Sequence, residues 1–329
     1  RDHCVTGVQT CALPIFSMDE ISLEKQYDPI DPVSSHETDF IFQDAAFLEY
    51  SKGAVPVTKA LPPQILTSND RSKLCTRNLD VDFLNLDPDY EHLLSDASSH
   101  VFFVTEGSGF SVVDTLHDHR TFTFLWEEGD AFVLPSCFKA VHRSLVKSKT
   151  TLLYASDKPL FDYLFAKPSQ ARFTPIFYKK DHMQSQLQRV NAEDGATLRN
   201  RNGILLSNPE MIKENLNTLT HVMWSLLNQI GPCTVQNPHR HNSVAIDLCT
   251  DLHPESENLV YTLMGPKLNE NGTVKDPIRM NWKKNAVFTT PPGWWHSHHN
   301  DSNHPAAVFP IQDAGLHTYM NTLDIQFQK

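Results

Sequence analysis

The sequence predicts an all-β protein in which two tandem β-barrels are joined by a short helical linker. Short strand-like runs separated by Gly and Pro turns recur along most of the 329 residues, a rhythm typical of a sandwich or barrel. The two halves share a pattern of turn, apolar strand and proline, seen as EEGDAFVLP (127–135) and again as KKNAVFTTP (283–291). Duplication of one barrel module accounts for both the length and the repeated pattern.

Two segments precede the first barrel. RDHCVTGVQTCALPIF (1–16) resembles the in-frame translation of a sequencing adapter, so we leave it out of the fold prediction. Residues 17–70 carry few periodic signals and several prolines, which favours an extended N-terminal arm that wraps the first domain.

Residues 71–165 are expected to form the first barrel. HVFFVTEGSGFSVVD (100–114) is a β-rich run broken at Gly107 and Gly109, which is typical of a hairpin. RTFTFLWEEGDAFVLP (120–135) turns at Glu128-Gly129-Asp130 and resumes as a buried strand, and TTLLYAS (150–156) supplies a further one.

Residues 166–203 are expected to form the helical linker. Met183, Leu187 and Val190 recur at helical spacing within residues 179–195, and Gly195 is placed to end the helix. The strand pattern returns from residue 204, so residues 204–329 are expected to form the second barrel.

Composition excludes several classes of function. The net charge of −11 argues against nucleic acid as a partner, because phosphate binding relies on clustered Lys and Arg. No window approaches the length of apolar run that crosses a bilayer. The four cysteines after residue 16 include no C-x-x-C pair, which favours buried thiols in a reducing compartment, and we expect a cytoplasmic protein.

Two short stretches carry candidate metal ligands. In NPHRHNSVAIDLC (237–249), His239 and His241 are separated by one residue. On a strand they share a face and lie about 6.5–7 Å apart, so both imidazoles can converge on one ion. In TTPPGWWHSHHN (289–300), a Pro-Gly turn precedes His296, which can place a third imidazole opposite the pair. The spacing therefore predicts a metal site in the second barrel.

The two stretches together resemble the signature motifs of the cupin superfamily, whose barrels are double-stranded β-helices, or jelly rolls. The first is H-x-H, and the second is P-x-G-x-x-H-x-x-x-N, which is filled by Pro291, Gly293, His296 and Asn300. Within that superfamily, HRHNSVA and PPGWWHSH are similar to the three-histidine form of the gentisate 1,2-dioxygenase group of bicupins. The resemblance implies that His239, His241 and His296 are the metal ligands.

This resemblance implies a non-haem Fe(II) dioxygenase that uses O₂ to cleave the ring of a gentisate-, salicylate- or hydroxynaphthoate-like compound. Imidazole also accepts Zn, Mn or Ni. His298 would accept protons or face the substrate, and His299 would point away by strand alternation. Two alternatives stay open: a lyase, isomerase or hydrolase that uses the ion as a Lewis acid, and a non-enzymatic ligand-binding or storage-like bicupin. A homo-oligomer is the family expectation.

The second barrel departs from the usual cupin pattern beside the histidine pair. The usual glutamate four or five positions after the second histidine is replaced by Ala245 and Ile246. Asp247 falls on the face of the histidines and would repel a substrate carboxylate unless a cation such as Arg279 pairs with it. Asp247 could also bind the metal through water or orient a ligand histidine, and we count it among the catalytic candidates.

Other candidate pocket residues follow from composition. We expect Arg279 to line the substrate pocket and, of the tryptophans near the motifs, only Trp295 to lie near the substrate. Gln312 belongs to a polar segment (310–324) that either lines the pocket mouth or forms an interface.

The first barrel has lost the motif. His100 and Glu106 match parts of it, but Phe102 occupies the second histidine position, and His142 follows Pro135 by seven residues instead of five. We expect this barrel to hold no metal and to serve packing and dimerisation.

Overall fold

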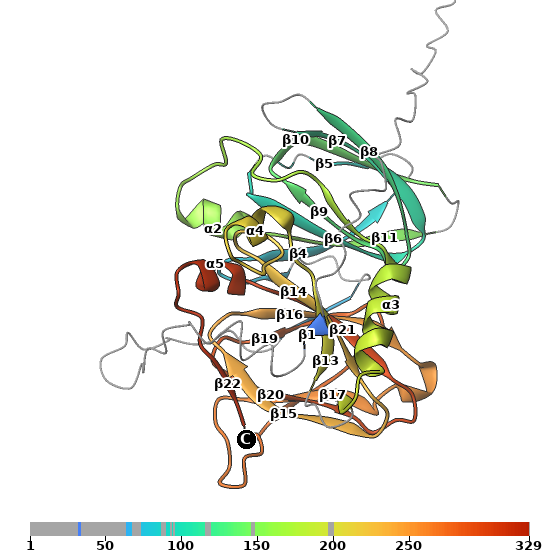
Figure 1. The fold of residues 1–329 in the computed structure, drawn as a ribbon, viewed down its shortest axis with the longest axis vertical. Helices are drawn as coiled ribbons and strands as arrows, with labels where there is room; N and C mark the ends of the chain where they lie inside the picture. Colours follow the sequence, from blue (N-terminus) through green and yellow to red (C-terminus); the bar gives the residue numbers. More distant parts are fainter. Residues whose placement is uncertain are drawn as a thin grey trace, which may run out of the picture.

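A computed structural model describes residues 32–33, 64–67, 74–86, 90–92, 94, 96–115, 120–145, 149–196 and 201–328. Its strands form four antiparallel sheets, which make two stacked double-sheet barrels (Figure 1). The predicted all-β class is confirmed. The adapter-like residues 1–16 lie outside the described residues.

The N-terminal barrel consists of a six-stranded and a four-stranded sheet. The larger sheet contains, in spatial order, β12 (Ile176–Tyr178), β9 (Ala131–Pro135), β6 (Ser99–Glu106), β11 (Thr150–Ser156), β4 (Asp80–Leu86) and β3 (Leu74–Cys75). The smaller sheet contains β5 (Tyr90–His92), β10 (Cys137–Ser144), β7 (Ser108–Thr115) and β8 (Thr121–Glu127). Gly107 joins β6 to β7 with φ of 88°, and a Cβ there would collide with Thr150, so the turn requires glycine.

The C-terminal barrel consists of a seven-stranded and a five-stranded sheet. The larger contains β1 (Pro32–Val33), β13 (Asn202–Leu205), β14 (Trp224–Ile230), β21 (Ala306–Gln312), β16 (Ala245–Leu252), β19 (Val287–Thr290) and β2 (Ile65–Leu66). The smaller contains β18 (Ile278–Asn281), β17 (Val260–Gly265), β20 (Trp295–Asn300), β15 (Thr234–His241) and β22 (Ile325–Phe327).

The two short strands that the structure describes within residues 17–70 pair with the second barrel. β1 pairs with β13 and β2 pairs with β19, so they occupy the two edges of the seven-stranded sheet. The prediction that the arm wraps the first domain is wrong for these strands. Sheet edges present unpaired backbone groups to any extended segment, and the sequence of an arm does not show which edge it meets.

The helical elements are short and lie at the barrel surfaces and between the barrels. They are α2 (Lys158–Tyr163), α3 (Lys180–Asn191), α4 (Pro209–Lys213), α5 (Ala314–Tyr319) and the 3₁₀ helix η3 (Pro254–Ser256). The predicted linker helix is α3, whose buried face carries Met183, Leu187 and Val190. The linker also supplies β12 to the first barrel and the start of β13 to the second. Within the described residues no helix is both long and apolar enough to span a membrane.

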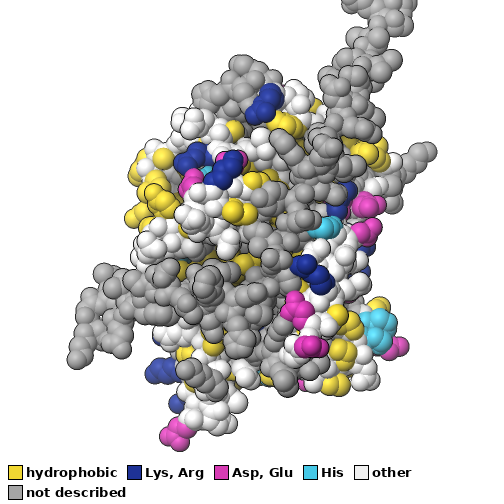
Figure 2. All heavy atoms as spheres, in the orientation of Figure 1, with side chains coloured by type: hydrophobic (Ala, Val, Ile, Leu, Met, Phe, Trp, Pro, Cys, Tyr) yellow, Lys and Arg dark blue, Asp and Glu magenta, His cyan; other side chains and the backbone are white. Residues whose placement is uncertain are grey.

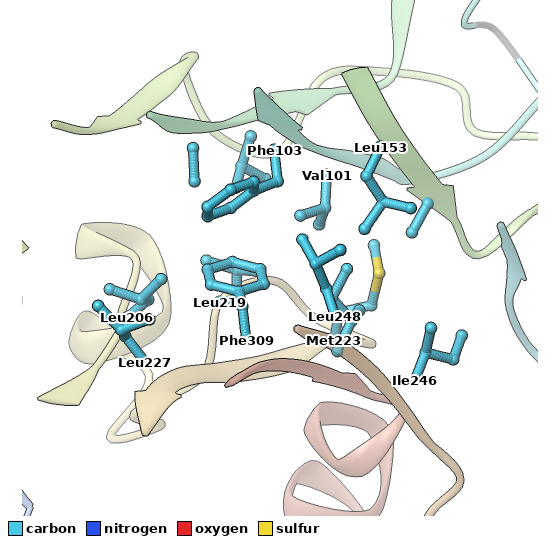
Figure 3. Packing of buried hydrophobic residues seen from close by; sticks show 14 of the residues in the cluster. Val101, Phe103, Leu153, Leu206, Leu219, Met223, Leu227, Ile246, Leu248 and Phe309 are labelled. Carbon is cyan, nitrogen blue, oxygen red and sulfur yellow. The ribbon is translucent and has the colours of Figure 1, made fainter. Parts of the chain in front are cut away.

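The largest hydrophobic cluster lies between the two barrels. Figure 3 shows Val101, Phe103 and Leu153 of the six-stranded sheet facing Leu248 and Phe309 of the seven-stranded sheet. The ring centroids of Phe103 and Phe309 are 5.1 Å apart. One face of the seven-stranded sheet therefore packs against the first barrel, and its other face lines the interior of the second barrel.

Candidate metal centre

Three histidines converge inside the C-terminal barrel. His239 and His241 alternate on β15, and His296 on the neighbouring β20 lies directly opposite His239. All three are buried, and one candidate ligand atom from each lies within 4.8 Å of the other two. Strand alternation and antiparallel pairing are together sufficient to bring the three rings onto one point.

Hydrogen bonds to the backbone orient two of these rings. Nδ1 of His241 lies 2.8 Å from the carbonyl oxygen of Ser243, and Nδ1 of His296 lies 3.0 Å from that of Trp294. A carbonyl only accepts, so each Nδ1 carries the proton and each Nε2 keeps a free lone pair. Nε2 of His241 is buried and has no hydrogen-bond partner.

Burial keeps the three imidazoles neutral. Desolvation lowers the pKa of His241 to about 4 and places the pKa values of His239 and His296 well below their ordinary range. A divalent ion requires neutral rings, and His241 and His296 each have a free lone pair on Nε2, whereas His239 must give up a hydrogen bond from Arg201 to its Nδ1 before it can bind an ion. The set fits a first-row divalent metal such as Fe(II) or Zn(II).

An arginine that the motifs do not contain touches the histidines. The guanidinium of Arg201 donates to Nδ1 of His239 and lies over the Phe327 ring, 5.6 Å from its centroid. Burial lowers the Arg201 pKa to about 10, which leaves the side chain positively charged at neutral pH. Arg201 lies just before β13, 38 residues upstream of His239, and no local sequence signal marks it.

Asp247 faces the same cavity from β16. Thr290 Oγ1 donates to its Oδ2 at 2.8 Å. Burial raises the pKa of Asp247 to about 7, and the positive charge of Arg201 opposes part of this rise. The carboxyl group therefore changes protonation near neutral pH.

The predicted pairing of Asp247 with Arg279 is not what the structure shows. Arg279 lies on β18 with its guanidinium 3.4 Å from the ring centroid of Tyr261, and it donates to the Asn258 carbonyl at 2.9 Å. The side chain is exposed on the outer surface because of its position in the β17–β18 pairing. The cation that acts on Asp247 is Arg201.

His298 lies beside the three histidines, and its tautomer follows from a buried chain of hydrogen bonds. Trp282 Nε1 donates to Thr262 Oγ1 at 2.9 Å, and Thr262 Oγ1 lies 2.8 Å from Nδ1 of His298. The Thr262 hydroxyl accepts from Trp282 and is free to donate its own proton to Nδ1 of His298. Nδ1 then accepts, so the proton of the neutral ring lies on Nε2. His299 lies away from the group, with its ring stacked on Tyr261 at 4.8 Å.

These side chains line a cavity with a volume of about 50 Å³. Trp224, Gln312, Ile325 and Phe327 line it together with Arg201, Asp247 and the histidines. The indole N–H of Trp224 is buried without a hydrogen-bond partner. The cavity has room for a metal ion with a few waters, since a water occupies about 10–15 Å³ on this measure.

The structure places Gln312 at the cavity and Trp295 outside it. Ser243 Oγ donates to Oε1 of Gln312 at 3.0 Å. Trp295 precedes His296 on β20, so its side chain points to the opposite face, where Arg240 lies 5.3 Å from its ring centroid. Trp224 lines the cavity, where Trp295 was expected.

Aromatic rings fill the N-terminal barrel at the corresponding level. Phe102 stacks on Phe132 with centroids 4.7 Å apart, and both nitrogens of His100 have partners in Tyr154 Oη and the Leu94 carbonyl. Among the described residues, the groups of ligating side chains close enough to hold a metal lie in the C-terminal barrel. That the first barrel binds no metal stays a prediction.

Two stacked double-sheet barrels of this topology define a bicupin fold. No protein-family model matches the sequence, and no curated protein matches it. Among solved structures, the chain is similar to salicylate 1,2-dioxygenase from Pseudaminobacter salicylatoxidans, with a TM-score of 0.63 and 13% identity over 86% of this chain and 92% of that one. Adducts of that enzyme with gentisate match with a TM-score of 0.56 and 13% identity, over 77% and 72%. At this identity the likeness is one of fold.

Proposed function

We propose that this protein is a non-haem Fe(II)-dependent dioxygenase that cleaves the ring of a hydroxylated aromatic acid of the gentisate, salicylate or hydroxynaphthoate type. The observation that carries the proposal is the group of three buried, neutral histidines beside a buried arginine. The likeness in fold to salicylate 1,2-dioxygenase supports it.

His239, His241 and His296 would hold the ion, and the same three donors accept Zn, Mn or Ni. Bound there, Fe(II) would supply the redox chemistry by which dioxygen reacts with an organic substrate. The free Nε2 of His241 supports this assignment, because a buried ring nitrogen without a partner is costly unless a ligand satisfies it.

The remaining groups of the cavity suit an anionic substrate. Arg201 offers a permanent positive charge for a carboxylate, and the unpaired indole N–H of Trp224 offers a further donor. Nε2–H of His298 would donate to a substrate oxygen. Asp247, whose pKa is raised by burial, would act as a second proton carrier beside His298.

The size of the cavity restricts how such a substrate enters. Pockets for drug-sized ligands measure about 300–1,000 Å³, and this one measures about 50 Å³. Ile325 and Phe327 of β22 cover one side of it, and β22 is a three-residue edge strand. We propose that β22 moves away from β15 when a ring enters.

The same small volume favours a second candidate. A lyase, isomerase or hydrolase that acts on a small oxygen-rich acid would need no movement of β22. There the ion would serve as a Lewis acid that polarises a substrate oxygen.

Oxygen uptake distinguishes the two candidates. The protein is loaded anaerobically with Fe(II) and supplied with gentisate-, salicylate- and hydroxynaphthoate-like acids in an oxygen electrode. The dioxygenase predicts substrate-dependent O₂ consumption that is lost in Arg201→Met and kept in the matched control Arg279→Met, which changes an exposed arginine of the same barrel. Turnover of small acids without O₂, supported by Zn or Mn, would favour the second candidate. Binding without turnover under either condition would contradict both enzymes and favour a ligand-binding bicupin.

A further inference from the structure

A second group of ligating side chains lies on the surface of the C-terminal barrel. His253 and Glu255 come from the turn that contains η3, and His304 comes from the turn between β20 and β21. One candidate ligand atom from each lies within 4.8 Å of the other two. From this cluster we infer a separate surface site that binds a divalent transition-metal ion of the Zn(II) class.

The donor set suits such an ion. Two imidazoles and one carboxylate are ligands that Zn(II), Co(II), Ni(II) and Cu(II) accept, and three protein ligands leave a position for water. His304 Nε2 lies 3.3 Å from Glu255 Oε2, and the rings of His253 and His304 are 3.7 Å apart at an angle of 17°. Nδ1 of His253 accepts from the backbone N–H of Glu255 at 3.3 Å, so this long hydrogen bond must break before the ring can offer a lone pair to an ion.

Buried hydrogen bonds hold the two turns in place. Ser256 Oγ donates to Ser302 Oγ at 2.8 Å, and both serines are buried. Asn300 Nδ2 donates to the His304 carbonyl at 2.8 Å, and Asn300 Oδ1 accepts from the backbone of Ser302 at 3.0 Å. The backbone under the three ligands is therefore fixed before any ion binds, which lowers the entropy cost of binding.

The ligand side chains themselves are free to adjust. His253 and Glu255 are exposed and His304 is half-buried. The stacked rings must turn out of their near-parallel arrangement for both nitrogens to approach an ion at about 2.0–2.1 Å. Figure 2 shows histidine side chains beside an acidic one at the edge of this barrel.

The surface site is distinct from the metal centre inside the barrel. Asp247 lines the inner cavity from one end of β16, and His253 follows the other end of the same strand. Six residues of extended chain separate them, which corresponds to about 20 Å. Binding at the surface site would link the turn after β16 to the turn after β20.

Counting bound metal tests the inference without any assay of activity. The inner site is first disabled with His239→Gln and His296→Gln, and Zn(II) binding to the full chain is measured by equilibrium dialysis. We expect one bound equivalent and, with Co(II), a visible absorption band. Adding Glu255→Gln should weaken binding at least about tenfold, the loss typical even of a group that only orients a ligand, and His253→Gln with His304→Gln should abolish it.

The chain offers a matched control. His221 and Glu214 form another histidine–glutamate pair, with His221 Nε2 3.7 Å from Glu214 Oε1, and no second histidine completes a described ligand group there. His221→Gln with Glu214→Gln should leave the bound equivalent unchanged. Binding that persists unchanged in the His253→Gln, His304→Gln protein would overturn the inference, and so would the absence of binding in the inner-site variant.

A second measurement covers a failure of the inner-site variant to fold. In the otherwise unchanged chain, His253→Gln with His304→Gln should lower the number of bound Zn(II) ions by one. An unchanged number would contradict the surface site and leave the proposed inner centre untouched.

Discussion

Replacing Asp247 with asparagine should change how the stability of the metal-free protein depends on pH. Asp247 is buried in the cavity, where desolvation raises its pKa from 3.8 to about 7. Asparagine keeps the size of the side chain and keeps an oxygen that can accept from Thr290. The substitution therefore removes the titration and little else.

The sign follows from the raised pKa. Below pH 4 both the folded and the unfolded chain carry a protonated Asp247. Between pH 4 and pH 7 the unfolded chain loses this proton and the folded chain keeps it, so the free energy of unfolding falls as the pH rises. A difference of about three between the two pKa values corresponds to about 4 kcal/mol over this range.

The assay is urea denaturation of the chelator-treated protein at intervals from pH 5 to pH 8. Histidine titrations affect the wild type and the variant alike, so the informative quantity is the difference between their free energies of unfolding. As the pH rises, the free energy of unfolding of Asp247→Asn should increase relative to that of the wild type, by an amount of the order of a few kcal/mol. An amide N–H left without a partner in the cavity would shift the whole difference by about 1–3 kcal/mol without changing its slope.

Asp251→Asn is the matched control, because Asp251 is an exposed carboxylate on the same strand. Its difference from the wild type gives the baseline against which the slope of Asp247→Asn is judged. A flat difference for Asp247→Asn would refute the claim that burial raises the pKa of Asp247, and with it the proposed role of this residue as a proton carrier.

Two further predictions concern packing. Phe309→Ala should lower the free energy of unfolding, measured by urea denaturation, by about 3–5 kcal/mol, because the ring is fully buried between the barrels against Phe103. Tyr163→Ala is the control and should lower it little, since that side chain is 78% exposed. Equal losses for the two variants would contradict the assigned interface. Phe327→Ala should speed extraction of bound metal by a chelator, since the Phe327 ring stacks on His239 and covers the cavity; an unchanged extraction rate would show that β22 does not limit access.

Only part of the convergence of the three histidines follows from local pattern, because His239 and His296 lie 57 residues apart and meet through the pairing of β15 with β20. H-x-H on a strand fixes two imidazoles on one face, and a Pro-Gly turn before His296 returns the chain beside them. The same rule explains why Trp295 does not line the cavity, contrary to the expectation from the sequence. A residue next to a ligand on a strand faces the other way, and Trp295 directly precedes His296.

Arg201 and Trp224 could not be assigned from local pattern. Arg201 lies just before β13 and Trp224 begins β14, and they reach the cavity because these strands pair with each other and then with β21. The pairing of β14 with β21 joins residues as far as 88 positions apart in the sequence, as Trp224 and Gln312 are. Arg279 lies closer in sequence to the second motif than Arg201 does. Its place on the outer face of β18 follows from the register of the β17–β18 pairing, which cannot be seen in the sequence.

The charges of the cavity restrict the substrate more than they restrict the reaction. Arg201 is positive at neutral pH, and a divalent ion at the three histidines would lower the pKa of Asp247 and favour its ionised form. The loaded cavity would then carry a net charge of about +2, which an acid with two ionisable oxygens would neutralise. A hydroxylated aromatic acid and a small dicarboxylic acid both meet this condition, so charge does not separate the two candidate functions. The small cavity is the property by which we propose to separate them, because a ring bound there would displace Ile325 and Phe327 of β22.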